Sequence, residues 1–155
     1  MKPTLGQPAP EFTAPVIGGT YTEETSLTLS ELRGKPVVLI FYPKDNTPGC
    51  TTQACAIRDE WADLRDQAHI FGVSIDSIQS HQKFIDKQEL PYALIADEDK
   101  AIVEAYGVWV EKSMYGKTYM GTERSTFIID AEGNLQSILE KVQPKKHLDL
   151  LREAL

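Results

Sequence analysis

Two cysteines, Cys50 and Cys55, are the residues whose type and spacing most directly suggest chemistry in this sequence. Four residues separate them, so they do not form the C-x-x-C pattern of dithiol redox motifs. The three histidines, His69, His81 and His147, are too scattered to complete a zinc site with them, and none of them has a partner cluster or a predicted role. A structural disulfide is improbable in a reducing compartment, so the cysteine pair is either incidental or redox-active.

The residues before Cys50 predict that its thiol lies at the start of a helix. Residues 36–42, PVVLIFY, are a continuous apolar run, which is typical of a strand buried on both faces. A turn-rich segment follows at residues 43–49, and apolar residues then recur at helical spacing. A helix N-terminus carries about half a positive charge and unpaired N–H donors, and it stabilises a thiolate, the reactive form of cysteine. Cys50 is therefore well placed to act as a nucleophile, and Cys55, about one turn further along, is less so.

A fast thiol reaction also needs groups that orient the bond being broken and stabilise charge on the leaving atom. Thr47 lies three residues before Cys50, so its hydroxyl could face the sulfur or a bound substrate. Pro43 ends the buried strand and could line the site without offering a competing N–H. Arg124 begins a second apolar strand, and its guanidinium is always charged and has several donors. These three residues are the candidates to assist Cys50.

The segment around Cys50 resembles a known family. FYPKDNTPGCT, at residues 41–51, resembles the active-site segment of peroxiredoxins, in the branch called bacterioferritin comigratory protein or peroxiredoxin Q. The resemblance covers essentially the whole chain, from GQPAPEF at residues 6–12 to RSTFIID at residues 124–130. It implies a thioredoxin-like fold and the activity of a thiol-dependent peroxidase.

The resemblance also implies a role for each candidate residue. The family's catalytic quartet of Pro, Thr, Cys and Arg would fall on Pro43, Thr47, Cys50 and Arg124. Cys50 would be the peroxidatic cysteine, and Cys55 matches the resolving cysteine, which in this branch often lies five positions further on. The implied substrates are hydrogen peroxide and alkyl hydroperoxides, and the implied reductant is thioredoxin or a similar dithiol. No metal, haem or flavin cofactor is implied, and a monomer is expected because this branch is often monomeric.

Helix geometry adds a consequence for the two cysteines. Five positions along an ideal helix place two Cα atoms roughly 8–9 Å apart. A disulfide needs Cα atoms about 4.4–6.8 Å apart. If Cys50 forms a sulfenic acid and then a disulfide with Cys55, the first helical turn is therefore predicted to unwind.

The order of elements predicts an α/β fold. Core strands are expected at residues 36–42, 69–76, 93–97, 125–130 and 135–139, the last two forming a hairpin. Helices are expected from the apolar spacing at residues 54–68, 78–85, 102–106 and 148–155, with one helical turn capped by Thr28. Residues 8–15 contain too many prolines for a central strand and are expected to be an extended lead-in or edge, and residues 108–122 a loop or exposed hairpin. The prediction is a single domain over residues 1–155, with a mixed central sheet flanked by helices on both faces.

Composition excludes several classes of function. The net charge of −7 argues against binding to a nucleic-acid backbone, which needs clustered cations. The longest apolar stretch is far shorter than the roughly 20 residues of a membrane-spanning helix, and the N-terminus lacks an apolar signal segment. No nucleic-acid or membrane partner is therefore expected, and the expected location is cytoplasmic.

Less specific interpretations remain for the individual residues. Cys55 could simply pack within an amphipathic helix, Thr47 could close a turn, and Pro43 could end a strand. Arg124 could form a surface ion pair. Two other functions also remain: a general thiol–disulfide oxidoreductase, which normally shows C-x-x-C, and a non-enzymatic redox-sensing module or holdase.

Overall fold

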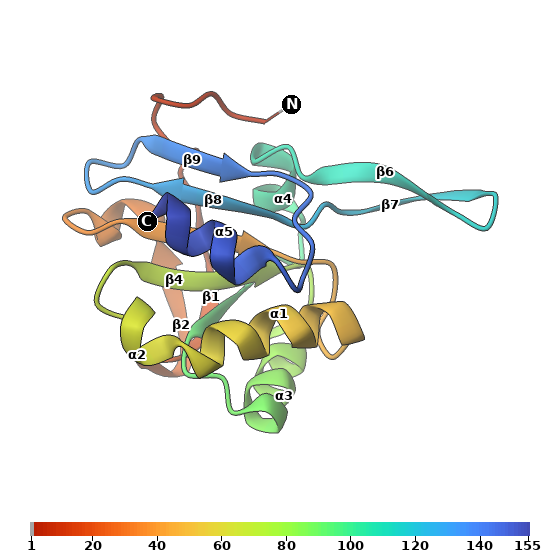
Figure 1. Ribbon diagram of the computed structural model, residues 1–155, viewed down its shortest axis with the longest axis horizontal. Helices are drawn as coiled ribbons and strands as arrows, with labels where there is room; N and C mark the ends of the chain where they lie inside the picture. The colour runs from red at the N-terminus through yellow and green to blue at the C-terminus, as the bar shows by residue number, and fades with distance from the viewer. Residues whose placement is uncertain (1) are drawn as a thin grey trace.

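The computed structural model describes residues 2–155, which form a seven-stranded mixed sheet and a separate two-stranded hairpin (Figure 1). The strands of the large sheet are β1 (Thr13–Gly18), β2 (Tyr21–Thr28), β3 (Val37–Phe41), β4 (His69–Ser74), β5 (Ala93–Ala96), β8 (Ser125–Ile129) and β9 (Leu135–Leu139). Their order is β2-β1-β5-β4-β3-β8-β9. β3, β4 and β5 are parallel, and the other pairings are antiparallel, which confirms the predicted mixed sheet.

Helices cover both faces of the sheet, as predicted. They are η1 (Leu29–Leu32), α1 (Pro48–Asp59), α2 (Trp61–Leu64), α3 (Ile78–Gln88), α4 (Ala101–Ala105) and α5 (His147–Ala154). Every residue of β3 is buried, and successive side chains point to opposite faces. Val38 and Ile40 belong to the hydrophobic layer under α1, α2, α3 and α5. Leu39 belongs to the opposite layer, which is covered by η1 and α4.

The central position of β3 determines where the candidate residues meet. The chain leaves the end of β3 through residues 42–47 and enters α1 directly. β8 is antiparallel to β3, and Ser125 pairs with Phe41, the last residue of β3. Arg124 immediately precedes β8, so the sheet register places it beside the end of β3 and the start of α1.

The N-terminal region differs from the prediction. Residues 13–18 form β1, which lies inside the sheet between β2 and β5, not at its edge. Pro15 is tolerated because it pairs only with Ser26 of β2, whereas pairing with β5 begins at Val16. β2 was not predicted, because its sequence lacks the apolar pattern of a strand. Its first six residues, before Leu27, are all partly or fully exposed.

Two helix boundaries also differ from the prediction. The apolar stripe that ends at Ala68 is not one helix, because the backbone leaves the helical conformation at Glu60 (φ −109°, ψ 16°) and divides the segment into α1 and α2. The turn after Thr28 exists as η1, but the Thr28 side chain does not cap it. The Glu11 carboxylate accepts a hydrogen bond from the Ser30 N–H at 3.0 Å instead.

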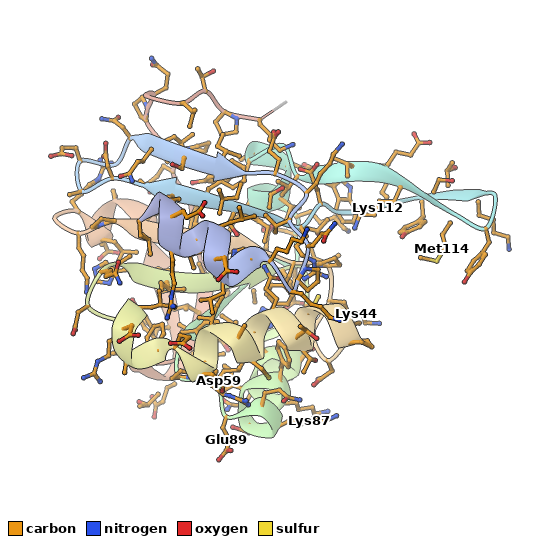
Figure 2. All side chains as sticks on the ribbon, viewed as in Figure 1. Lys44, Asp59, Lys87, Glu89, Lys112 and Met114 are labelled. Atoms are coloured by element: carbon orange, nitrogen blue, oxygen red, sulfur yellow. The ribbon has the colours of Figure 1, made fainter. Side chains whose placement is uncertain are left out.

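Residues 108–122 contain an exposed hairpin, one of the two conformations predicted for them. β6 (Trp109–Met114) and β7 (Lys117–Thr122) pair only with each other and extend away from the body of the molecule (Figure 1). Tyr115 and Gly116 form the turn with positive φ angles of 53° and 77°, and Met114 lies next to this turn (Figure 2). No helix in the described part of the chain has the length and apolar character that a membrane span requires.

Candidate active site

The thiol of Cys50 is buried at the first turn of α1. Thr47 is the N-cap residue, Pro48 occupies the first helical position, and Cys50 is the third helical residue. Only 2% of Cys50 is exposed, and it packs in the layer between the sheet and α1, with Tyr42 among its neighbours. The unpaired N–H groups of the first turn and the helix dipole favour negative charge at this position. This location agrees with the one predicted from the sequence.

Arg124 is the residue that directly contacts this thiol. Its Nη2 donates to Cys50 Sγ at 3.3 Å, and its Nη1 donates to Gln53 Oε1 at 2.6 Å. The two contacts use separate nitrogens of the planar guanidinium and fix its orientation. Gly49 leaves room for it, because a Cβ atom there would lie 3.2 Å from Arg124 Nη2. The structure thus brings together two residues that are 74 positions apart in the chain.

Gln53 was not among the predicted site residues. It lies one helical turn after Cys50, on the same face of α1, and only 2% of it is exposed. Its Nε2 is buried and has no hydrogen-bond partner among residues 2–155. The sequence does contain a signal for Gln53: it is a polar residue among apolar ones on the face of the helix that carries Cys50.

Thr47 and Pro43 lie in the loop before α1, but no hydrogen bond joins them to Cys50 within residues 2–155. The Thr47 hydroxyl donates to the Lys44 carbonyl at 2.8 Å, and the Thr47 carbonyl accepts the Thr51 N–H at 2.9 Å. Because its hydrogen is used by Lys44, the Thr47 hydroxyl offers only lone pairs to any further partner. Pro43 is half-buried and directly follows Tyr42.

Cys55 is a half-buried free thiol in the same helix as Cys50. Its Sγ lies 3.5 Å from Gln88 Oε1, at the end of α3. Arg58 Nη1 donates to the Gln88 carbonyl at 2.7 Å, so two contacts hold this part of α1 against α3. Both cysteines are thus reduced and helical in this structure.

Two ionisable groups near Arg124 have lowered pKa values, which favour their uncharged forms. Burial, followed by the positive charge of Arg124, lowers the pKa of His147 to about 4, so its imidazole is neutral near pH 7. His147 Nε2 lies 2.7 Å from Thr126 Oγ1, while its Nδ1 has no partner in the described residues. Burial and then Arg124 also lower the pKa of Lys112, a residue of β6 (Figure 2). In both groups the positive charge of Arg124 acts in the same direction as burial, which is the larger cause.

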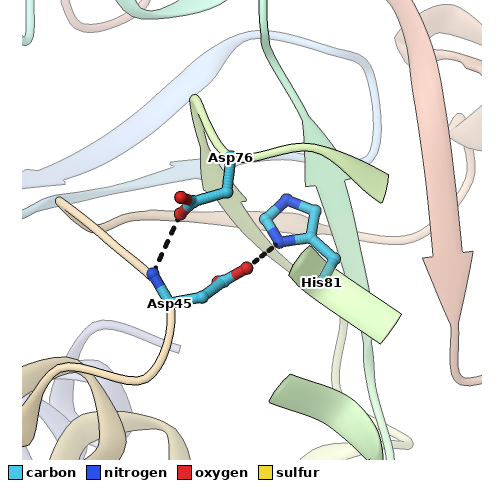
Figure 3. A group of neighbouring side chains, drawn as sticks. All are labelled: Asp45, Asp76 and His81. Atoms are coloured by element: carbon cyan, nitrogen blue, oxygen red, sulfur yellow. Dashed lines mark hydrogen bonds and ion pairs between the residues drawn. The ribbon is translucent and has the colours of Figure 1, made fainter. Parts of the chain in front are cut away.

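A second polar cluster lies beside the loop that leads into α1. Asp45, Asp76 and His81 place one oxygen or nitrogen atom each within 4.8 Å of one another (Figure 3). His81 Nδ1 is 2.7 Å from Asp45 Oδ2, and its Nε2 donates to the Ile95 carbonyl at 2.9 Å. The expectation that His81 has no partner was therefore wrong, because its partner is 36 residues away in sequence.

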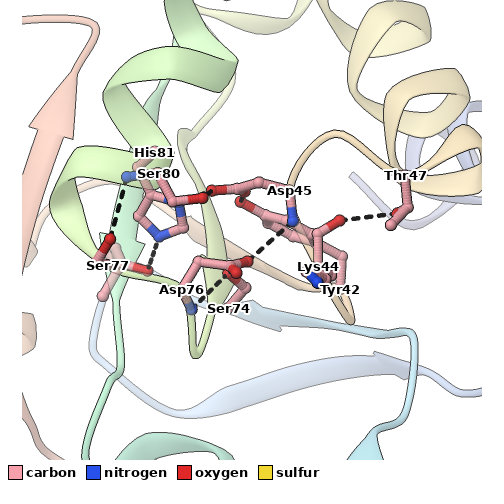
Figure 4. A network of polar contacts seen from close by, with 10 residues as sticks. Tyr42, Lys44, Asp45, Thr47, Ser74, Asp76, Ser77, Ser80 and His81 are labelled. Atoms are coloured by element: carbon pink, nitrogen blue, oxygen red, sulfur yellow. Dashed lines mark hydrogen bonds and ion pairs between the residues drawn. The ribbon is translucent and has the colours of Figure 1, made fainter.

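Protein donors already occupy the atoms that could bind a metal in this cluster. Asp45 Oδ1 accepts the Tyr42 hydroxyl at 2.6 Å, and Oδ2 also accepts the Ser80 hydroxyl at 2.8 Å (Figure 4). Both ring nitrogens of His81 have partners. The cluster is a satisfied hydrogen-bond network, so its donor set does not fit an open metal site.

Comparison with protein families resolves the membership of the chain. The model of the AhpC/TSA family matches residues 5–138, most of the chain. This chain is a peroxiredoxin of that family. It is 46% identical over 145 residues to "Peroxiredoxin Bcp" of Bacillus subtilis, covering 93% of this chain and 89% of the relative. It is 45% identical over 145 residues to "Putative peroxiredoxin bcp" of Coxiella burnetii, covering 93% of each.

Solved structures agree with this membership. The peroxiredoxin superposes on the bacterioferritin comigratory protein of Xanthomonas campestris with a TM-score of 0.83 and 36% identity, covering 92% of this chain and 88% of the other. It superposes on BcpB of Mycobacterium tuberculosis with a TM-score of 0.80 and 29% identity, covering 97% and 94%. The thioredoxin-like fold and the enzyme class implied by the sequence resemblance are thus confirmed.

Proposed function

We propose that this peroxidase works through Cys50 and Cys55 without a cofactor. The Cys50 thiolate attacks one oxygen of a hydroperoxide, the O–O bond breaks, and Cys50 becomes a sulfenic acid. The leaving oxygen takes up a proton and departs as water or an alcohol. The Cys55 thiol then attacks the sulfur of the sulfenic acid, a disulfide forms, and the oxygen of the sulfenic acid leaves as water.

The contact between Arg124 and Cys50 is the observation that carries the proposal. A fixed guanidinium 3.3 Å from the sulfur stabilises the thiolate and the negative charge that moves onto the leaving oxygen. The Thr47 hydroxyl, whose hydrogen is bound to Lys44, supplies lone pairs that accept the O–H of the peroxide. Pro43 lines the site beside them without a competing N–H.

Disulfide formation requires α1 to unwind at its start. Both cysteines are helical in the reduced structure, and ideal helix geometry separates their Cα atoms by roughly 8–9 Å, beyond disulfide range. The contacts of Cys55 and Arg58 with Gln88 hold the middle of α1 on α3. The turn that contains Cys50 is therefore the part that moves, and Cys55 stays near its place.

The rest of the cycle follows from the thiol chemistry. A dithiol such as thioredoxin exchanges with the disulfide and restores both thiols, and the substrates are hydrogen peroxide and organic hydroperoxides. The proposal includes a cytoplasmic location, where thiols are kept reduced. It also includes a single-domain monomer, because Cys50 and Cys55 lie in one helix and need no second chain.

Mass spectrometry of the reduced protein after one equivalent of hydrogen peroxide tests the cycle. The expected result is loss of two hydrogens within seconds in the wild type, and one added oxygen on Cys50 in Cys55→Ser. Hydrogen exchange at residues 47–57 should rise in the disulfide form, because the first turn of α1 has opened.

Thr52→Ser is the matched control, since it changes an exposed residue of the same helix and should react like the wild type. A wild type that keeps its sulfenic acid would leave Cys55 as a packing residue. A reaction no faster than that of an ordinary thiol would exclude the whole cycle.

A further inference from the structure

One peptide unit, between Lys44 and Asp45, connects the proposed site to the second polar cluster (Figure 4). Its carbonyl oxygen, on Lys44, accepts the Thr47 hydroxyl at 2.8 Å. Its N–H, on Asp45, donates to Asp76 Oδ2 at 2.9 Å. The C=O and N–H of one planar unit point in opposite directions, so rotation of this peptide would move both contacts together. The orientation of the Thr47 hydroxyl is therefore coupled to Asp76.

Asp76 is itself held in place from the end of β4. The Ser74 hydroxyl donates to Asp76 Oδ2 at 2.7 Å, and the Asp76 N–H donates back to Ser74 Oγ at 3.2 Å. Ser74 is fully buried in the sheet. The carboxylate that receives the Asp45 N–H is thus fixed to the rigid centre of the fold and not to a mobile loop.

The Asp45 side chain holds the same loop from another direction. It accepts hydrogen bonds from Tyr42, which follows β3, and from Ser80 and His81 of α3. His81 Nε2 donates to the Ile95 carbonyl, because a carbonyl only accepts, and His81 Nδ1 lies 2.7 Å from Asp45 Oδ2, so both ring nitrogens are held in place. The side chains of Asp45 and His81 are 1% and 0% exposed. The Lys44–Asp45 peptide therefore has few other orientations available.

We propose that Asp76 is a positioning residue of the peroxidase: it orients the Lys44–Asp45 peptide and thereby directs the lone pairs of Thr47 toward the peroxide. The inference rests on the function proposed above. Asp76 lies next to the site loop but does not touch the thiol, so it acts through Thr47. The cost of a misoriented donor or acceptor falls on the step that breaks the O–O bond, since that step alone needs Thr47.

The first test compares two reactions of Cys50. Asp76→Ala removes the acceptor of the Asp45 N–H and should lower the rate constant for hydrogen peroxide by about ten- to a hundred-fold. Alkylation by iodoacetamide needs the thiolate but not Thr47, so its rate should change by less than about threefold. Asp76→Asn keeps an acceptor oxygen and should recover most of the peroxide rate. Equal losses in both reactions would mean that Asp76 only maintains the structure.

A double-mutant cycle tests whether Asp76 acts through Thr47. Thr47→Val removes the hydroxyl at similar volume and should itself slow the peroxide reaction. In that background, Asp76→Ala should have almost no additional effect, because the group that it positions is gone. Independent losses that multiply in the double variant would overturn the inference.

Two further variants show whether a loss of rate comes from a general folding defect. Ser77→Ala removes the hydrogen bond from the Ser80 N–H to Ser77 Oγ that caps α3, but leaves both carboxylates of the cluster, so both rates should stay at wild-type values. Ser74→Ala keeps the Asp76 carboxylate and removes its support from β4, so it should cause a smaller loss in the peroxide reaction alone. If Asp76→Ala fails to fold, Ser74→Ala decides the question.

The inference and the proposed function fail in different ways. A wild type no faster than a free thiol would remove the proposed function and the inference with it. A fast wild type with a slow Thr47→Val, but with Asp76→Ala and Ser74→Ala at wild-type rates, would remove the inference alone.

Discussion

Two groups of buried polar residues flank the loop before α1, and they differ in how completely they are satisfied. Around Cys50, the Arg124 guanidinium contacts the Cys50 sulfur and one amide oxygen, and Gln53 Nε2 has no partner within residues 2–155. Around Asp45, each carboxylate oxygen and each ring nitrogen of His81 has a partner at 2.6–2.9 Å. Gln53 in the first group thus has an unpartnered buried donor, whereas every polar side-chain atom of Asp45 and His81 has a partner.

The difference supports the proposal that a substrate binds beside Cys50. Unpaired buried polar groups reduce stability, so a protein retains them where a ligand will supply the missing contacts. A saturated network instead resists rearrangement and holds its backbone in one conformation. Changes at the residues that contact Cys50 should therefore affect mainly the reaction, and loss of the hydrogen bonds between Asp45 and α3 mainly the stability.

The largest expected effect is a loss of stability when the hydrogen-bond network around Asp45 is broken. Asp45→Ala removes the partner of the Tyr42 hydroxyl, the Ser80 hydroxyl and the His81 ring, and each buried polar group left unsatisfied costs about 1–3 kcal/mol of unfolding free energy. Urea unfolding measures this loss. Asp86→Ala, at an exposed position of α3, is the control and should change the unfolding free energy by less than about 0.5 kcal/mol. Equal effects of the two variants would show that the network is not the stabilising group.

The next largest effect should be on the rate at which Cys50 reacts with peroxide. Arg124→Met removes the donors beside the sulfur, and loss of a preorganised donor of this kind lowers a rate constant by about 10²–10³-fold. Stopped-flow measurement of Cys50 oxidation by hydrogen peroxide gives the number. Arg152→Met, which removes an equal charge from the exposed ion pair with Glu60, should leave the rate unchanged. A similar loss in both variants would point to overall charge as the cause.

A pH effect on stability should come from His147, which lies close enough to Arg124 for the charge of the guanidinium to lower its pKa. Its folded pKa of about 4 lies below the unfolded value of about 6.5, so below pH 6.5 the unfolded state binds a proton that the folded state does not. The stability contribution is complete above pH 6.5 and is lost as the pH falls toward 4, by at most about 3 kcal/mol. Unfolding free energies measured from pH 7.5 to 4 should fall more steeply in the wild type than in His147→Gln. Parallel curves would contradict the buried neutral imidazole.

The smallest effect should come from Gln53, where rate and stability are expected to separate. Gln53→Leu removes the acceptor that orients Arg124, and should slow peroxide reduction by about tenfold. It also removes the unpartnered Nε2 from the interior, so the unfolding free energy should stay constant or rise by up to about 1 kcal/mol. Gln82→Leu, at a partly exposed position of α3 away from Cys50, is the control for replacing a glutamine by leucine. A Gln53→Leu variant with lower stability and an unchanged rate would reverse the assignment of Gln53 to the reactive group.

The parts of the fold predicted correctly are those specified by local patterns. The apolar run of β3 and the helical spacing after Cys50 were sufficient to place the thiol at a helix start, because burial on both faces and amphipathic spacing are properties of short segments. β1 was misplaced for the same reason: the prolines of residues 8–15 suggested an edge, but the position of β1 inside the sheet depends on partners in β2 and β5.

The sequence by itself determined the family, the strand–loop–helix unit that carries Cys50, and the identity of the residues proposed to assist it. Tertiary structure alone decided that Arg124 reaches both Cys50 and Gln53, and that Asp45 pairs with a histidine on α3. Such contacts join residues 36 to 74 positions apart, and they form only when β3, β8 and α3 are packed in their final register. Because a long-range polar contact leaves no periodic trace in the chain, a single sequence cannot reveal it.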